Sequence, residues 1–289
     1  SRGLGDVYKR QGALLPKSVM REDGSGIESA DRKIDSICPY CGVGCQLTYH
    51  IKDDHLLRVE GRDGPANENR LCVKGRFGFD YVHHTHRLIM PLIRKDGITK
   101  DASDQVDPAD PSSHFREASW DEALSVAAKG LVSIRDEHGG AALAGFGSAK
   151  CSNEEAYLFQ KLVRTGFETN NVDHCTRLCH ASSVAALFEG IGTGAVTAPF
   201  TACKDADVII VIGANPTENH PVAATFFKQA AKRGAHLIVM DPRGQALKRH
   251  ASRMLEFKPN KDVALLNAML NVIVTEKLYD QQYIQAHTS

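Results

Sequence analysis

The chain has 289 residues, enough for two domains, and its 35 Lys plus Arg balance its 35 Asp plus Glu. This balance excludes a general electrostatic attraction to nucleic acid or to an anionic membrane, so partners must be recognised locally. The longest strongly apolar stretch, 208–213, is far shorter than the ~18 residues of a membrane span. Eight cysteines in a chain of this length favour metal ligation in a reducing compartment, and we expect a cytoplasmic protein.

The hydrophobic pattern predicts four parts in chain order. The first is polar and aperiodic and predicts a disordered leader, the second is a small cysteine-rich domain, the third is a surface connection with Asp-Pro turns, and the fourth is a larger domain. Their ranges are 1–33, 34–94, 95–118 and 119–289.

Strands and helices alternate in the larger domain. Capping-box signatures at Ser119 and Ser152 predict two helix starts. Apolar runs predict buried strands at 141–146, 206–212 and 235–240 and helices at 221–232 and 262–276, and the small domain is expected to hold strands at 46–52 and 55–60 and a helix opening at Cys72. This alternation predicts an α/β protein with a doubly wound, mostly parallel Rossmann-like sheet after the small domain.

Four cysteines near the start of the chain follow the spacing C-x2-C-x3-C-x26-C: Cys38, Cys41, Cys45 and Cys72. Three clustered thiols plus a distant one are typical of iron-sulfur ligation, and glycines at 42 and 44 let the backbone wrap around a compact anion. Structural zinc is the alternative, although zinc loops usually come as two CxxC pairs. Lys74 is either a solvated surface charge or a bridge from the cluster to a second redox group.

A second cysteine pair lies in the segment NNVDHCTRLCH, where Cys175 and Cys179 are followed directly by His180. If this loop enters a helix over 181–189, the helix start favours the thiolate form of Cys179. The alternative is that both cysteines are small buried hydrophobic residues. We expect buried structural thiols at Cys151, Cys175 and Cys203.

The strand predicted at 206–212 leads into the turn GANPTENHP and a helix, and the next strand ends at Asp241. Such a unit binds a mononucleotide, with the helix start facing phosphate and the acid facing a ribose or base. The turn is not GxGxxG, which argues against NAD here. Ordinary turn chemistry at strand ends is the alternative for each of these residues.

Five blocks in this order carry a resemblance to a known family: CPYCGVGC, RLCVKGRFGFDYV, NNVDHCTRLCH, GANPTENHP and VMDPR. From about residue 37 onward the chain resembles the molybdopterin-guanine-dinucleotide oxidoreductases, and most of all the alpha subunits of soluble NAD-dependent formate dehydrogenases. The resemblance implies the molybdopterin oxidoreductase fold, a 4Fe-4S cluster, and molybdenum or tungsten in a bis(molybdopterin guanine dinucleotide) cofactor. Because such subunits are several hundred residues longer, we expect an amino-terminal fragment that does not turn over formate alone.

The resemblance also implies roles for single residues. The four cysteines would hold the 4Fe-4S cluster, Cys179 would ligate molybdenum, His180 would be the catalytic histidine, and Lys74 would lie on the electron route from pterin to cluster. The pterin dinucleotide would be lined by Gly213, Asn215, Thr217, Glu218 and His220, with Asp241, Arg243 and Asp262 at its guanosine end, and Gly147, Ser148 and Lys150 would touch the other pterin.

The activity implied by the resemblance is oxidation of formate to carbon dioxide, with electrons passed toward NAD by flavin and iron-sulfur partner subunits. His180 favours formate because nitrate reductases of the family typically have methionine after the metal-binding cysteine. A nitrate reductase-type molybdoenzyme remains an alternative, as does a non-catalytic electron-transfer subunit of a complex I-like assembly. Cys179, His180 and Lys74 argue against the latter.

Overall fold

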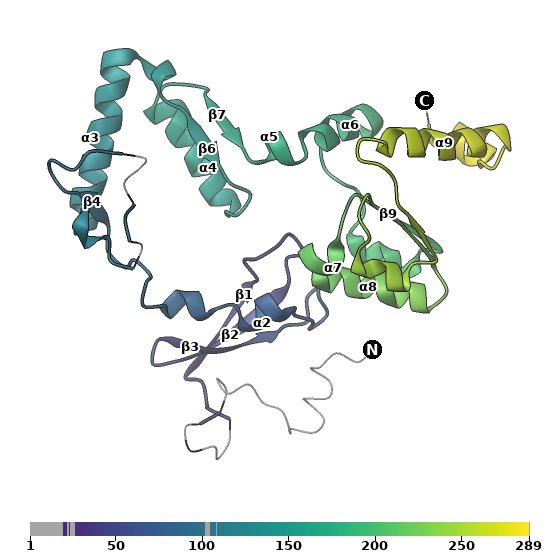
Figure 1. Cartoon of the computed structure of the whole chain (residues 1–289), viewed down its shortest axis with the longest axis horizontal. Helices are drawn as coiled ribbons and strands as arrows, with labels where there is room; N and C mark the ends of the chain where they lie inside the picture. The colour runs from purple at the N-terminus through teal and green to yellow at the C-terminus, as the bar shows by residue number, and fades with distance from the viewer. Residues whose placement is uncertain (1–19, 22, 24–26, 102–104, 108, 289) are drawn as a thin grey trace. The chain divides into compact units, whose positions relative to one another are not determined.

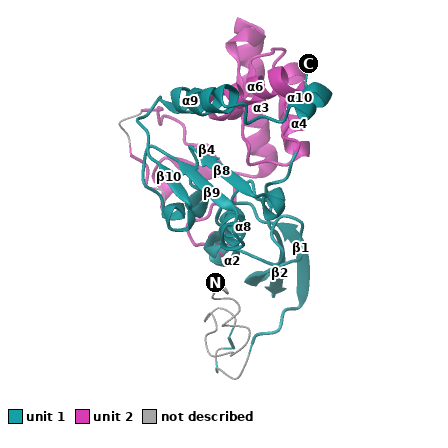
Figure 2. Ribbon diagram, turned by 90° about the vertical axis from the view of Figure 1, so that its right-hand side faces the viewer, with its two compact units in different colours: residues 1–79, 198–289 teal, residues 80–197 magenta. Residues whose placement is uncertain are grey.

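The computed structural model describes residues 20–21, 23, 27–101, 105–107 and 109–288. The chain divides into two compact units, one made of Ser1–Phe79 with Ala198–Ser289 and the other of Asp80–Thr197 (Figure 2). The predicted leader lies mostly outside the described residues, and the predicted domain boundaries stay predictions.

The first unit opens with a three-stranded antiparallel sheet in the order β1-β2-β3 (Figure 1). Its strands are β1 (Arg32–Ile37), β2 (Gln46–Lys52) and β3 (His55–Gly61). The central strand β2 buries Leu47 and Ile51, and this apolar alternation is what allowed it to be predicted. Strand β1 was not predicted, because most of its residues are exposed polar ones and give no alternation.

The same unit contains a parallel sheet in the order β10-β9-β8. Its elements are β8 (Val208–Ile212), α7 (Pro216–Asn219), α8 (Pro221–Lys232), β9 (His236–Met240) and β10 (Arg253–Leu255), followed by α9 (Asp262–Thr275) and α10 (Gln281–His287). Ala230 of α8 packs against Leu237 and Val239 of β9, so this helix covers one face of the sheet. The strands predicted at 206–212 and 235–240 and the helices predicted at 221–232 and 262–276 are thereby confirmed.

The described residues of the second unit form two short sheets and the helices α3 to α6. Its elements are β4 (Leu92–Arg94), β5 (Phe115–Glu117), α3 (Trp120–His138), β6 (Gly145–Gly147), α4 (Asn153–Lys161), β7 (Val172–His174), α5 (Thr176–Cys179) and α6 (Ala181–Ile191). Strands β4 and β5 pair antiparallel, and β6 and β7 pair parallel. None of the helices in the described part of the chain is both long and apolar enough to cross a membrane.

Both predicted helix starts are confirmed, but they are capped differently. Ser152 and Glu155 form the full reciprocal capping box at α4. Ser119 accepts a hydrogen bond from the backbone amide of Glu122 at 3.2 Å, but the Glu122 carboxylate pairs with Arg116 at 2.5 Å instead of returning to the cap. Only half of the predicted box therefore exists at α3.

The predicted fold class is confirmed: a small β-containing amino-terminal part precedes an α/β arrangement with parallel strands. Two details were wrong. The described parallel strands form two separate sheets, and the strand predicted at 141–146 is shortened to Gly145–Gly147. The chain makes a 3₁₀ turn over Gly140–Ala142, where a side chain on Gly140 would lie 2.4 Å from the backbone oxygen of Phe167. This close approach of two backbone segments bends the chain before the strand can begin.

Candidate functional site

The loop between β1 and β2 carries the first three cysteines and closes on itself. The Cys38 amide donates to the carbonyl of Cys45 at 2.8 Å, and the Gly44 amide donates to the carbonyl of Cys41 at 3.4 Å. Gly44 has a φ of +68°, a left-handed conformation that glycine adopts without strain. The loop therefore holds three thiols close together, as the sequence predicted.

Asn67 fastens the segment that leads to Cys72 onto this loop. Its side chain is fully buried, and its Oδ1 accepts from the Gln46 amide at 2.9 Å. Its Nδ2 donates to the carbonyls of Gln46, Arg62 and Arg70 at 3.0, 3.2 and 3.0 Å. Because Gln46 follows Cys45 and Arg70 precedes Cys72 by two residues, one amide joins both cysteine segments. Sequence reasoning missed Asn67, since an asparagine in a turn gives no sign of its partners.

The four predicted cysteines line one pocket of the first unit, which the structure thereby brings together. Its other lining residues are Tyr40, Val43, Leu71, Gly75, Pro221 and Val222. Cys38 and Cys45 are buried, and Cys41 and Cys72 are half-buried. Burial, followed by the charges of Cys38, Cys41 and Cys72, raises the pKa of the Cys45 thiol to about 12. Four thiols so close together in an apolar pocket need a cationic centre to become thiolates, so this donor set fits an iron-sulfur cluster.

Helix α2 (Val73–Phe77) begins directly after Cys72, as predicted, and contributes Gly75 to the pocket. A side chain on Gly75 would place its first carbon 3.5 Å from the sulfur of Cys38 and 3.3 Å from Leu71. The helix thus comes close to the sulfur because this position has no side chain. Lys74 is exposed on the same helix, and its predicted role in the electron route stays a prediction.

Most of the predicted nucleotide-binding residues of the first unit follow the carboxyl ends of β8 and β9, whereas Asp262 begins helix α9. The Gly213 amide donates to the carbonyl of Met240 at 2.9 Å, and the buried carboxylate of Asp241 accepts from the Arg243 amide at 2.8 Å. Gly213 has a φ of +60° and open space where a side chain would stand, which suits close approach of a ligand. Thr217 donates to Asn215 at 2.5 Å, which fixes the turn.

Gln245 is a residue of this edge that the sequence did not single out. Its Nε2 donates to the carbonyl of Ala214 at 2.8 Å and to Asp241 at 3.3 Å, so it ties the two strand ends together. Its Oε1 is buried and has no hydrogen-bond partner among the described residues. An acceptor left without a donor at this edge fits a ligand that brings N–H or O–H groups, as a pterin dinucleotide does. The other predicted contacts are exposed or half-buried: Glu218, His220 and Asp262.

The predicted metal ligand and catalytic histidine lie in the second unit. Cys179 ends the short helix α5, and His180 stands between α5 and α6, with both side chains exposed. Asp173, the middle residue of β7, pairs with Arg177 at 2.8 Å, and this guanidinium together with the His174 amide lowers the pKa of the Asp173 carboxyl. This ion pair joins β7 to α5, the short helix that ends in Cys179.

Gly147 lies beside this segment, because it ends β6 and pairs with His174 in the parallel ladder. Ser148 and Lys150 follow in the exposed turn before α4. These three predicted pterin contacts and the Cys179 segment thus start from the same sheet edge. The expectation of buried thiols was wrong for Cys151 and Cys175, which are exposed, whereas Cys203 is half-buried against both cores.

Comparison with known proteins decides the family. The molybdopterin oxidoreductase family matches residues 87–287, and the molybdopterin oxidoreductase Fe4S4 domain matches residues 31–84. The chain belongs to the molybdopterin oxidoreductase family. It therefore combines the parts for a 4Fe-4S cluster and for a molybdenum-pterin cofactor. The four-thiol pocket lies within the Fe4S4 match, except for Pro221 and Val222.

Known molybdopterin oxidoreductases similar to this chain include formate dehydrogenases. The F420-dependent formate dehydrogenase subunit alpha of Methanocaldococcus jannaschii is 38% identical over 256 residues, covering 88% of this chain and 35% of the relative. Formate dehydrogenase H of Escherichia coli is 34% identical over 258 residues, covering 89% and 35%. Acetylene hydratase from Pelobacter acetylenicus shares the fold with a TM-score of 0.69 at 23% identity, covering 87% of this chain and 33% of the other. The chain spans about a third of the length of these relatives.

Proposed function

We propose that the complete protein oxidises formate to carbon dioxide, releasing one proton and two electrons. The observation that carries this proposal is His180 directly after Cys179, in a chain 34% and 38% identical to two proteins named as formate dehydrogenases. The bound molybdenum-pterin cofactor supplies the two-electron chemistry. The residues of this chain bind it, orient the substrate and manage the proton.

The proposed roles of the second unit concern the metal and the proton. Cys179 ligates the metal through its sulfur. His180, exposed beside it, orients formate and accepts the proton, because a ring nitrogen of imidazole can act as a general base. Gly147, Ser148 and Lys150, which start from the same sheet edge as the Cys179 segment, contact one pterin.

The proposed roles of the first unit concern the dinucleotide and the electrons. The edge formed by Gly213, Asn215, Thr217, Glu218 and His220 lines the second pterin dinucleotide, with Asp241, Arg243 and Asp262 at its guanosine end. Lys74 lies on the route by which electrons reach the cluster held by Cys38, Cys41, Cys45 and Cys72. Electrons leave for NAD through flavin and iron-sulfur partner subunits in the cytoplasm. Because one relative is named as F420-dependent, the electron acceptor of this protein is tested separately from its substrate.

The test compares formate oxidation with nitrate reduction by the complete protein, using viologen dyes as electron acceptor or donor. We expect formate oxidation without nitrate reduction, and a loss of at least about 100-fold in kcat for His180→Ala, the usual contribution of a positioned acid-base group. Cys179→Ala should abolish activity, and Cys151→Ala is the matched control for an exposed cysteine. Nitrate reduction alone, activity that survives Cys179→Ala, or iron without either molybdenum or tungsten in the purified protein would contradict the proposal.

A further inference from the structure

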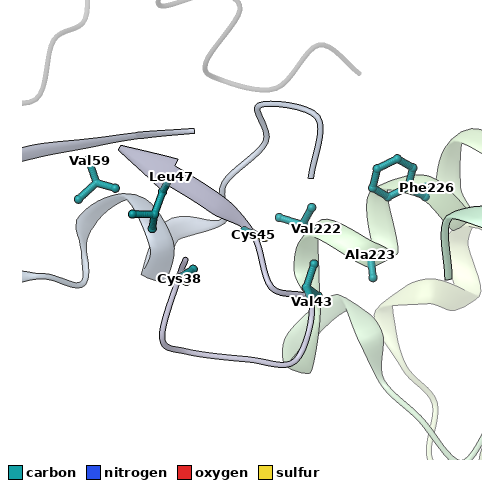
Figure 3. Packing of buried hydrophobic residues seen from close by; sticks show 8 residues of the cluster. All are labelled: Cys38, Val43, Cys45, Leu47, Val59, Val222, Ala223 and Phe226. Atoms are coloured by element: carbon teal, nitrogen blue, oxygen red, sulfur yellow. The ribbon is translucent and has the colours of Figure 1, made fainter. Parts of the chain in front are cut away.

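The four-thiol pocket has a wall that comes from the far end of the chain. Pro221 and Val222, at the start of α8, line the pocket together with the cysteines. Val222, Ala223 and Phe226 lie on one face of the helix, since they are one and four residues apart, and all three are buried in the same core as Cys38 and Cys45 (Figure 3). Helix α8, which follows the turn that begins at Gly213, therefore also shields the four thiols of the pocket from water.

Two cations contact Phe226 on this face of α8. The side chain of Phe226 is fully buried, and the guanidinium carbon of Arg70 lies 4.3 Å from its ring centroid. The ammonium of Lys204 lies 4.9 Å from the same centroid. Such contacts are attractive because the face of an aromatic ring is electronegative, and more so where water is excluded.

A carboxylate joins the two cations. Glu68 pairs with Lys204 and, at 3.1 Å, with Arg70. The other guanidinium nitrogen of Arg70 donates to Gln229 of α8 at 3.4 Å. We call this group of Glu68, Arg70, Lys204 and Phe226 the clasp. Its members come from the segment before Cys72, from the 3₁₀ turn Phe200–Asp205 and from α8.

The clasp acts on both sides of the pocket at once. Arg70 stands two residues before Cys72, and its backbone carbonyl is held by Asn67 at 3.0 Å. Phe226 stands one helical turn after Val222, so a shift of the ring moves the wall of the pocket. Fixing Arg70 on Phe226 therefore fixes the fourth thiol relative to the apolar wall.

We propose that the clasp is a positioning device for the cluster: it holds Cys72 in place and keeps α8 pressed over the thiols, and so sets the reduction potential and lifetime of the cluster. Burial and the apolar shell around a cluster control both properties. Water that enters the pocket stabilises the reduced, more negatively charged cluster, so a loosened clasp raises the reduction potential. The proposal rests on the cluster that belongs to this family and not on formate as the substrate.

The test is Phe226→Leu in the complete protein, with Phe227→Leu as matched control. Phe227 is the next residue of the same helix, but it packs against the other core of the unit, around the parallel sheet. The readouts are the reduction potential from an EPR-monitored titration and the rate at which an iron chelator removes the cluster. We expect Phe226→Leu to raise the potential and to speed cluster loss about tenfold or more, the usual range for residues that support a metal site. Phe227→Leu should leave both readouts near the wild-type values.

A second pair of variants avoids opening a cavity in the core. Lys204→Met removes one cation of the clasp, and Lys248→Met removes the lysine of a more exposed pair, with Glu256 at 3.1 Å. Chelator-driven cluster loss should be faster in Lys204→Met only. Rescue of the wild-type rate by Lys204→Arg would support the clasp, because arginine keeps both the charge and the contact with the ring.

The clasp would be overturned if Phe226→Leu and Phe227→Leu changed the reduction potential and the rate of cluster loss equally. It would also be overturned if both Phe226→Leu and Lys204→Met lost the cluster at the wild-type rate. Either result would leave the four-thiol site in place. A wild-type protein that binds no cluster would overturn the site and the clasp together. Neither outcome depends on formate oxidation, which is measured separately.

Discussion

The four-thiol pocket and the pair Cys179 and His180 differ in how far their own unit encloses them. Cys38 and Cys45 are 8% and 5% exposed and are covered by residues about 180 positions away in the sequence, whereas Cys179 and His180 are exposed. A hydrogen-bonded loop, a buried asparagine and a helix wall position the thiols of the pocket. The cluster site can therefore be tested through the packing of the chain around it, whereas the proposed role of Cys179 as a metal ligand is tested by its effect on activity.

Loss of one buried thiol should have the largest effect on the pocket. Cys45→Ala removes the buried thiol at the end of the loop, directly before β2, and we expect the bound cluster to be lost, as judged by iron and sulfide analysis and by visible absorption. Cys151→Ala removes an exposed thiol of the second unit and should retain the cluster. Full iron content in Cys45→Ala would contradict this view of the pocket, because a buried thiol of the pocket would then not be a cluster ligand.

A side chain at position 75 should have the second-largest effect on the pocket. The first side-chain carbon of Gly75→Ala would lie 3.5 Å from the Cys38 sulfur, an ordinary contact, whereas the branches of Gly75→Val would enter the pocket. We expect cluster content near the wild-type level in the alanine variant and a severe loss in the valine variant. Similar cluster content in both variants would mean that the helix α2 does not face the cluster.

Asn67→Ala should destabilise the first unit by about 2–4 kcal/mol, because it leaves backbone groups of both cysteine segments without their partner. Chemical denaturation monitored by circular dichroism measures this loss. Asn69→Gly is the control, since Asn69 is exposed and has a φ of +62° that glycine adopts freely. A loss in Asn67→Ala no larger than in Asn69→Gly would show that this amide does not hold the loop.

The smallest expected effect is a pH dependence from His50 on the central strand β2. His50 is 2% exposed, and burial followed by the charge of Arg58 lowers its pKa, although Glu60 lies 3.2 Å from its Nε2. As the pH falls below about 6.5, the unfolded chain takes up a proton that folded His50 resists, so the folded state loses stability. We expect the thermal midpoint to drop between about pH 7.5 and pH 5.5, and to drop less in His50→Gln. An equal drop in His50→Gln would assign the pH dependence to other groups.

The sequence predicted those parts of the site that depend on local spacing. The intervals between the four cysteines gave the donor set, and hydroxyl and carboxylate residues three apart marked the starts of α3 and α4. The apolar runs of β8, α8 and β9 gave the parallel sheet, because a buried strand and a buried helix face each leave a periodic pattern.

Contacts between distant segments could not be predicted. Val222 reads as an ordinary core residue of α8, and nothing local shows that it faces thiols from the other end of the unit. Asn67, Arg70 and Gln245 look like common turn and surface residues, although their hydrogen bonds and ring contacts join separate segments. Strand β1 was not predicted, because its backbone pairing with β2 does not require apolar residues.

Iron and sulfide analysis, combined with EPR of the reduced protein after anaerobic reconstitution, tests the central claim most directly. If the four thiols hold one 4Fe-4S cluster, the chain will bind about four iron and four sulfide and give the signal of a reduced cluster, even when zinc is offered at the same time. Binding of a single iron or zinc ion per chain, without sulfide, would contradict the account.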